Sequence, residues 1–449
     1  MADDPRHRFC LILRGGENET AHRARERLTA LPPREVLWVD DPGSESGRFE
    51  AIKPGAVRGL LGGSFTAVVV NAHRQLDPDL LGRCHGFVWG GGVLVLRLPP
   101  VDVEPSGERD GLAAYPYESS DVGTRFYDRF QRRLQAAELP VPEEVTSPDI
   151  EVEGTEEQAG LVRQLVDLLE SPRWTTASLL ADRGRGKSSA LGLAVRKLRR
   201  ADGSFQVGVT AGSREAVAEI FRFATGGAEP VETDDVRFVE TTDLAAGDGA
   251  FDAIFVDEAA QLPVPTLRKL TCEHSQCDLL FSTTTHGYEG TGRGFTLRFL
   301  EWLEARSRPH HRFELRQPIR WDAEDPLESF VFDALLLDAE PADLDAPVGV
   351  DDVEHRRLDR DALAGDERLL REFFGLLVRA HYRTTPADLR RMLDAPNLDL
   401  HALLHDGSVV AATWVAREGD LTESMCEELY RGHRRLLGHA LPETFVTNL

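Results

Sequence analysis

A glycine-rich segment near the middle of the chain carries the residue types that bind phosphate. Residues 181–188 read Ala-Asp-Arg-Gly-Arg-Gly-Lys-Ser, between an apolar run at Thr175–Leu180 and a helical pattern at Ser189–Arg200. A strand, a glycine-rich loop and a helix form the context of a phosphate-binding loop, because backbone N–H groups there can face phosphate oxygens. We therefore predict a nucleotide site. Its expected phosphate contacts are Gly184, Arg185, Gly186, Lys187, Ser188 and Ser189.

Two side chains of this loop have expected roles in such a site. Lys187 would reach the β- and γ-phosphates, and Ser188 would ligate Mg²⁺. The loop departs from the usual pattern at Ala181, where glycine is common, so the backbone there must avoid a φ that only glycine tolerates. The alternative interpretation is an ordinary strand, loop and helix that contain Gly-Lys-Ser by chance.

An acidic pair follows a second apolar run further along the chain. Residues 251–259 read Phe-Asp-Ala-Ile-Phe-Val-Asp-Glu-Ala, so a buried strand would end at Asp257 and Glu258. Asp257 would then hold Mg²⁺ beside Ser188, and Glu258 would orient the attacking water. A strand that ends in a solvated acidic turn is the alternative. Together the loop and the acidic pair predict an ATPase that binds ATP and Mg²⁺.

Three further polar residues are candidates for the same site. Gln158 lies upstream of the loop, where helicase-like ATPases use a glutamine to bind adenine; the alternative is an exposed helix glutamine. Arg293 follows the apolar run Asp278–Thr284, and Arg320 lies further on. Both are candidates to stabilise charge during phosphoryl transfer. Each could instead be a surface arginine.

The charge of the chain limits its partners. Its formal net charge is -24, from 76 acidic and 52 basic residues, whereas nucleic-acid binders are usually basic. Either the chain does not bind nucleic acid, or it functions in a high-salt cytoplasm where surface carboxylates keep proteins hydrated. The scarcity of lysine favours the second interpretation. A local arginine-lined groove could still bind RNA in a globally negative protein.

Cysteine content and hydropathy argue against a zinc-binding, a membrane and a secreted protein. The five cysteines are scattered and odd in number, which favours reduced thiols over a zinc site. The sequence has no apolar run of about 18 residues and no secretory leader, so we expect a cytoplasmic protein without a membrane partner.

Apolar runs and helical stretches divide the chain into three α/β units, expected at 1–145, 150–345 and 350–449. In the first unit we expect a turn at Gly90–Gly92, and an Arg-rich helix at Phe126–Leu134 that presents a solvated face. In the third, Asp-Gly at 406–407 between apolar runs predicts a hairpin. The strands predicted in the first unit are Phe9–Leu13, Val36–Val39, Ala67–Asn71 and Val93–Leu98.

Several segments, in order along nearly the whole chain, resemble the tRNA(Met) cytidine acetyltransferase family. Residues 90–100, Gly-Gly-Gly-Val-Leu-Val-Leu-Arg-Leu-Pro-Pro, resemble part of its first domain. The segments from His286 and from His381 are the most specific. Besides residues 90–100, the segments with this resemblance are Ala181–Ser188, Val256–Pro263, His286–Phe295, Gln317–Trp321, His381–Asn397 and Arg431–Pro442.

The resemblance implies an N-terminal α/β domain, a RecA-like P-loop ATPase with a mainly parallel sheet, and a GNAT acetyltransferase domain followed by a tRNA-binding region. It implies N4-acetylation of the wobble cytidine of elongator tRNA(Met), with acetyl-CoA as donor and hydrolysis of ATP or GTP.

One part of the family's pattern is expected to be missing. GNAT domains bind the acetyl-CoA pyrophosphate with an Arg/Gln-x-x-Gly-x-Gly/Ala loop that opens a helix, and we expect this helix-opening loop to be absent after residue 350. We therefore expect a truncated start of the GNAT fold, with this chain supplying the ATPase part. Its expected partners are tRNA(Met) and a separate polypeptide with the remaining regions. The alternatives are a stand-alone RNA-stimulated ATPase or helicase-like module, or an inactive fragment without acetyl transfer.

Overall fold

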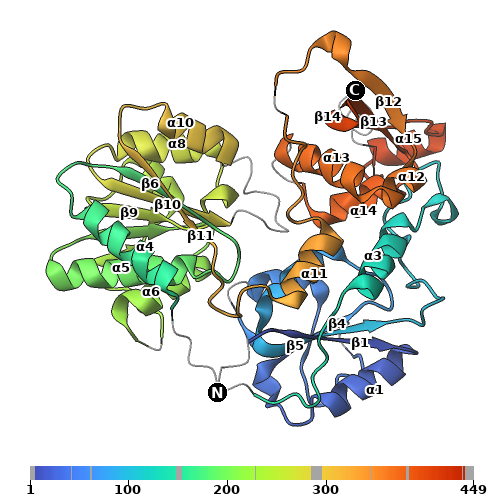
Figure 1. Cartoon of the computed structure of the whole chain (residues 1–449), viewed down its shortest axis with the longest axis horizontal. Helices are drawn as coiled ribbons and strands as arrows, with labels where there is room; N and C mark the ends of the chain where they lie inside the picture. Colours follow the sequence, from blue (N-terminus) through green and yellow to red (C-terminus); the bar gives the residue numbers. More distant parts are fainter. Residues whose placement is uncertain are drawn as a thin grey trace.

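The computed structural model contains a sheet in each of the three predicted units (Figure 1). It describes residues 6–41, 43–60, 63–147, 154–227, 229–284, 296–344, 346–380, 384–436 and 438–439. Within these ranges, none of the helices has the length and apolar character needed to span a membrane.

The first sheet has five strands in the order β1-β5-β4-β2-β3, and all neighbouring strands are parallel. A parallel sheet is covered on both faces, which explains why its strands are continuous apolar runs. The four strands predicted here are confirmed. The elements are β1 (Phe9–Arg14), α1 (Glu17–Arg27), β2 (Val36–Val39), β3 (Ala51–Ile52), β4 (Phe65–Asn71), α2 (Pro78–Cys84), β5 (Val88–Leu98) and α3 (Arg125–Ala136).

The turn predicted at Gly90–Gly92 is wrong, because these glycines lie inside β5, beside an irregularity in its pairing with β4. A Cβ atom on Gly90 would lie 2.7 Å from the backbone oxygen of Arg6 and 2.8 Å from that of Arg320. The Gly90 N–H donates to the same Arg320 oxygen at 2.7 Å. The missing side chain therefore allows a segment of the second unit to lie directly against β5.

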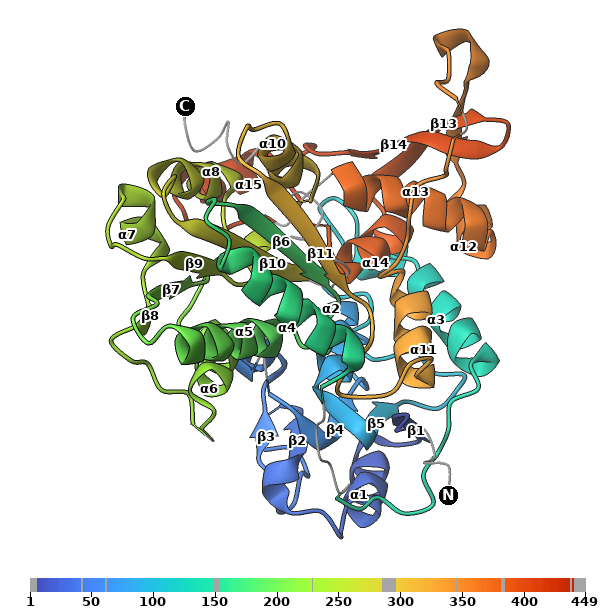
Figure 2. The same ribbon diagram turned by 60° about the vertical axis from the view of Figure 1, so that its left-hand side comes forward.

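The second sheet has six strands in the order β11-β6-β10-β9-β7-β8, again all parallel. Helices α4, α5 and α6 pack on one face, and α7, α8 and α10 pack on the other (Figure 2). The predicted mainly parallel α/β architecture is confirmed. The strands are β6 (Thr176–Ala181), β7 (Val207–Thr210), β8 (Val236–Phe238), β9 (Ala253–Val256), β10 (Asp278–Thr284) and β11 (His310–Leu315). The helices are α4 (Glu156–Leu169), α5 (Lys187–Ala201), α6 (Ala218–Thr225), α7 (Thr241–Ala246), α8 (Val264–Glu273) and α10 (Glu301–Glu304).

The third sheet is antiparallel, in the order β12-β13-β14. The predicted hairpin is confirmed: Asp406 and Gly407 both have positive φ, at 48° and 80°, as a two-residue type I′ turn requires. The elements are β12 (Glu354–Leu358), α12 (Arg360–Gly365), α13 (Glu367–Ala380), α14 (Pro386–Asp394), β13 (Leu398–His405), β14 (Ser408–Ala416) and α15 (Glu423–Tyr430). That this unit begins a GNAT fold stays a prediction.

The first and third units share one hydrophobic core, which includes Val68 and Leu96 of the first sheet and Phe373 of α13. Helix α11 (Pro326–Leu335) follows the second sheet in sequence but packs into this same core. The Phe330 ring of α11 meets the Phe130 ring of α3 edge-on, with 5.6 Å between centroids. Figures 1 and 2 show α11 beside α3. The second sheet is therefore built from a segment that leaves this core and returns to it through α11.

The expectation of a solvated Arg-rich face on α3 holds for Arg132, which is exposed, but is wrong for Arg129. Arg129 is only 1% exposed; it pairs with Glu367 at 2.6 Å and donates to the carbonyls of Asp333 and Ala334. A charged group can be buried when a carboxylate and hydrogen-bond acceptors satisfy it. Arg129 thereby joins α3 to α11 and α13.

A second buried ion pair joins the first unit to the start of α11. Arg8 and Asp325 lie 2.8 Å apart, and both side chains are 0% exposed. Burial lowers the pKa of the Arg8 guanidinium, and Asp325 opposes this shift. The same carboxylate caps α11 by accepting the Glu328 N–H at 2.7 Å. One carboxylate therefore neutralises a buried charge and begins the helix.

Asp325→Asn should lower the free energy of unfolding of the shared core by about 3–5 kcal/mol, because it leaves the Arg8 charge buried without a counter-ion. The matched control is Asp322→Asn in the neighbouring pair of Arg6 and Asp322, whose side chains are 42% and 38% exposed. That change should cost about 0–1 kcal/mol. Urea unfolding followed by tryptophan fluorescence measures both, and equal losses would contradict the assignment.

Candidate functional site

The glycine-rich loop connects β6 to α5 as predicted. Ala181 lies at the end of β6 in extended conformation, so this position does not require glycine. Gly184 and Gly186 have φ of +79° and +80°, which is the left-handed region that glycine occupies without strain. Gly186 is the N-cap of α5, whose first residue is Lys187. The first N–H groups of a helix lack intrahelical partners and can bind an anion.

The acidic pair lies directly beside this loop. Strand β9 ends before Asp257, which is 1% exposed. The Ser188 hydroxyl donates to one oxygen of Asp257 at 2.6 Å, and the Ser282 hydroxyl of β10 donates to the other. Burial and the neighbouring Glu258 raise the pKa of Asp257, while Lys187 and the two hydroxyls act against this rise. The structure thus brings together the two oxygen donors predicted as Mg²⁺ ligands, and oxygen is the donor that Mg²⁺ prefers.

Lys187 and Glu258 also meet at this edge of the sheet. The Lys187 Nζ lies 3.2 Å from Glu258 Oε1 and donates to the Thr284 hydroxyl at 3.1 Å. The same hydroxyl lies 3.3 Å from each Glu258 carboxylate oxygen. The three residues follow or end strands β6, β9 and β10, which are adjacent and parallel. Ligand sites in open α/β sheets lie at these carboxyl ends.

Gln158 on α4 is 3% exposed, so the alternative of an exposed helix glutamine is wrong. Its side-chain amide donates to the Gly186 carbonyl at 3.1 Å and to the Ser189 hydroxyl at 2.8 Å. The Ser189 hydroxyl itself donates to Gly186 at 3.0 Å. Gln158 of α4 and Ser189 of α5 therefore both hold the Gly186 carbonyl of the loop. Contact of Gln158 with adenine stays a prediction.

The Arg185 side chain points toward α11. It forms a two-point ion pair with Glu328, at 2.9 and 3.1 Å, and its side chain is only 9% exposed. A role for Arg185 in phosphate binding through its backbone stays a prediction. Glu328 was not predicted as a site residue, because its sequence position indicates only the first turn of a helix.

Of the two arginines predicted to stabilise charge, the structure describes only Arg320. Arg293 lies outside the described residues. Arg320 donates to the carbonyls of Gly63 and Gly86, at 3.3 Å each, and its guanidinium lies 5.6 Å from the Trp89 ring centroid. These contacts are all with the first unit. Arg320 therefore joins the second unit to the first, and its role in stabilising charge stays a prediction.

Trp321 packs against the outer side of the loop and is 0% exposed. The Arg8 guanidinium lies 3.4 Å from its ring centroid, and its indole N–H donates to Glu328 at 3.3 Å. Two residues earlier, the Ile319 N–H donates to the Gly184 carbonyl at 2.8 Å. Segment 317–321 thus lies between the phosphate-binding loop and the first unit. From the sequence, this segment was identified only by its resemblance to the family, and no structural role was predicted for it.

Comparison with known proteins gives matches over two parts of the chain. The family model described as tRNA(Met) cytidine acetyltransferase TmcA, N-terminal, matches residues 1–140. The model described as RNA cytidine acetyltransferase NAT10/TcmA, helicase domain, matches residues 178–338, which include the loop, Asp257, Glu258 and Trp321.

Curated relatives match nearly the whole chain. It is 36% identical to a tRNA(Met) cytidine acetyltransferase TmcA from Nitrosococcus halophilus, over 99% of this chain and 63% of the relative. It is 38% identical to the protein of that name from Haloferax volcanii, over 93% of this chain and 61% of the relative. The chain therefore spans 61–63% of the length of these two relatives.

Gly184→Ala should destabilise the second unit by roughly 1–3 kcal/mol, because it forces a side chain into left-handed backbone. The added Cβ would also lie 2.7 Å from the Trp321 ring. The matched control is Gly203→Ala, where a Cβ would meet no heavy atom within 4 Å and φ is not positive. Thermal unfolding measures both variants. If Gly184→Ala is as stable as the control, the loop is not held in this conformation by Trp321.

Proposed function

Since the chain belongs to the tRNA(Met) cytidine acetyltransferase family, we propose that it supplies the nucleoside triphosphate hydrolysis that accompanies N4-acetylation of the wobble cytidine of tRNA(Met). The observation that carries this proposal is the meeting of Lys187, Glu258, Ser188 and Asp257 at one edge of a parallel sheet. Each residue type at this edge has a role in phosphoryl transfer.

The residues of this edge fit a Mg²⁺–nucleotide complex. Ser188 and Asp257 offer a hydroxyl and a carboxylate that already lie in contact, at 2.6 Å, and these would hold Mg²⁺. When bound, Mg²⁺ neutralises charge on phosphate oxygens. The left-handed glycines and the N-terminus of α5 would hold the phosphates of ATP or GTP.

Three side chains of this site have distinct roles in the proposed reaction. Lys187, which is 8% exposed, places a positive charge where solvent screens it weakly, so its attraction for a phosphate is strong. Glu258 is the base that orients a water molecule and accepts its proton. The Thr284 hydroxyl contacts both side chains and so holds them in register.

Because the chain belongs to this family, we include acetyl transfer in the proposal. The acetyl donor is acetyl-CoA, and the acceptor is tRNA(Met). The sequence does contain a match to the Arg/Gln-x-x-Gly-x-Gly/Ala string, because residues 435–440 read Arg-Leu-Leu-Gly-His-Ala. We assign the acetyl-CoA pyrophosphate site to no residue, because Leu437 and Ala440 lie outside the residues that the structure describes.

Lys187→Ala should lower ATP turnover by roughly 10²-fold or more, because a preorganised charge at the phosphates is lost. The matched control is Lys197→Ala on the exposed side of the same helix, which should leave turnover unchanged. Phosphate release is measured with ATP and with GTP, in the presence and absence of a tRNA(Met) transcript. We expect the transcript to raise the turnover of the wild-type chain. Unchanged turnover in Lys187→Ala would refute the site.

Glu258→Gln should keep nucleotide binding and lose hydrolysis, because the amide cannot accept a proton from water. A filter-binding assay with labelled ATP should detect a complex that persists through many wild-type turnover times. Glu273→Gln, at the exposed end of α8, is the matched control and should turn over normally. If Glu258→Gln hydrolyses ATP at the wild-type rate, another group positions the water.

A further inference from the structure

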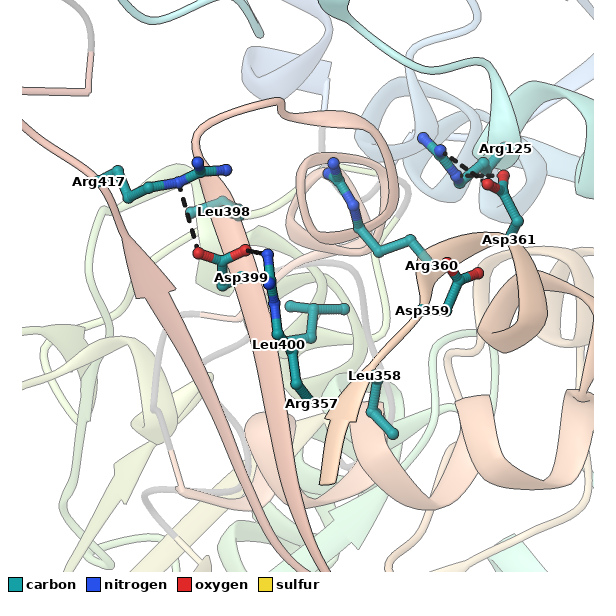
Figure 3. A pocket seen from close by; sticks show the side chains of 10 residues that line it. All are labelled: Arg125, Arg357, Leu358, Asp359, Arg360, Asp361, Leu398, Asp399, Leu400 and Arg417. Carbon is teal, nitrogen blue, oxygen red and sulfur yellow. Dashed lines mark hydrogen bonds and ion pairs between the residues drawn. The ribbon is translucent and has the colours of Figure 1, made fainter. Parts of the chain in front are cut away.

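A polar pocket of about 450 Å³ lies where the third sheet meets helix α3 of the first unit (Figure 3). It is bounded by the end of β12, the start of β13 and the residue that follows β14, with Arg125 of α3 on one side. This pocket is remote in sequence from the phosphate-binding loop. Its lining residues are Arg125, Arg357, Leu358, Asp359, Arg360, Asp361, Leu398, Asp399, Leu400 and Arg417.

The lining contains four arginines and three aspartates, so it carries a net positive charge in a chain whose net charge is -24. Asp399 accepts from Arg357 at 2.5 Å and lies 3.4 Å from Arg417. Arg125 pairs with Asp361 at 2.6 Å. Three arginines therefore share two carboxylates.

The fourth arginine, Arg360, has no carboxylate partner within ion-pair distance among the residues that the structure describes. Its guanidinium donates to the Ala395 carbonyl at 2.5 Å. Burial, followed by the charge of Arg125, lowers the pKa of Arg360. The preceding Asp359 uses its carboxylate to cap α12 at the Ala362 N–H. Arg360 is thus a partly buried cation that an external anion would stabilise.

The guanidinium groups lie in a row along the pocket and do not converge on one point. Figure 3 shows Arg417 and Arg357 on either side of Asp399, then Arg360, then Arg125 with Asp361. The Arg357 and Arg417 side chains are 66% and 52% exposed. Ion pairs this exposed contribute only about 0–1 kcal/mol, so a phosphate can replace Asp399 at little cost. Guanidinium groups bind phosphate oxygens in a two-point geometry.

We propose that this pocket binds the phosphodiester backbone of an RNA strand, with Arg360 at its centre and Arg357 and Arg417 beside it. The proposal rests on the proposed function, in which RNA is the substrate. A row of cations fits consecutive phosphates of one strand better than it fits a single small anion. In a chain with a large negative charge, RNA binding needs such local sites, because the overall field repels a polyanion.

Arg360→Gln and Arg357→Gln should each weaken binding of a fluorescent tRNA(Met) transcript by about three- to tenfold at moderate salt. Each change should also reduce the slope of log Kobs against log salt by about 0.7–0.9, which corresponds to one phosphate contact. The matched control is Arg356→Gln, one residue away on β12, where Arg356 pairs with Glu354 and does not line the pocket. Arg357→Gln is included because its exposed side chain is not needed for folding.

Asp399→Asn should have the opposite effect on RNA binding. It removes the carboxylate that Arg357 and Arg417 share, so it should tighten RNA binding by about threefold or more and steepen the salt slope. A merely structural role for these residues would not make RNA bind more tightly. Fluorescence anisotropy over a range of salt concentrations measures all four variants, and thermal unfolding confirms that each is folded.

The outcomes separate this proposal from the proposed function. If the wild-type chain binds the transcript and the pocket variants bind it equally well, the pocket assignment is overturned while the ATPase proposal stands. If inorganic pyrophosphate binds the wild-type chain but not Arg360→Gln, and RNA affinity is unchanged, the pocket takes a free phosphate and the RNA assignment is overturned. If the wild-type chain hydrolyses ATP but binds no RNA, both the pocket and the tRNA substrate are refuted.

Discussion

The buried indole of Trp321 is the contact on which the arrangement of the units depends. Its face lies 3.4 Å from the Arg8 guanidinium of the first unit, and its edge meets Gly184 of the phosphate-binding loop. A cation over a desolvated indole contributes about 2 kcal/mol, but the arrangement is possible only because Asp325 neutralises Arg8 and Glu328 neutralises Arg185. The conformation of the loop is therefore set partly by residues outside the sheet that carries it.

The shared core of the first and third units supports this contact. Helix α11 begins with Asp325 and packs against α3 and the first sheet, so the carboxylates that face the loop are fixed by a core elsewhere. Gly90 of β5 adds a backbone hydrogen bond to Arg320. The ion pair of Arg8 and Asp325 is fully buried, and separating the two charges would be costly because one would remain buried without its partner.

Sequence predicted the features that depend on local patterns. The loop, the acidic pair and the Asp406–Gly407 turn follow from glycine positions and apolar runs, which act over a few residues. It did not predict edge strand β12, whose residues Glu354–Leu358 are mostly exposed and charged and so lack apolar alternation. It also missed pairs that only folding brings together, such as Arg185 with Glu328. The burial of Arg129 was missed for the same reason, because its partners are far away in sequence.

Arg8, Arg97 and Arg129 differ in their partners from Arg360 of the pocket. Arg8, Arg97 and Arg129 are each 0–1% exposed, and each faces a carboxylate at 2.6–2.8 Å. In an acidic chain with four lysines, carboxylate partners are abundant, so a buried guanidinium without one is not explained by composition. Among the described residues, Arg360 has no carboxylate partner within ion-pair distance, and its guanidinium donates to the backbone carbonyl of Ala395. Since a partly buried cation gains from a counter-charge, an anion from outside the chain would stabilise Arg360.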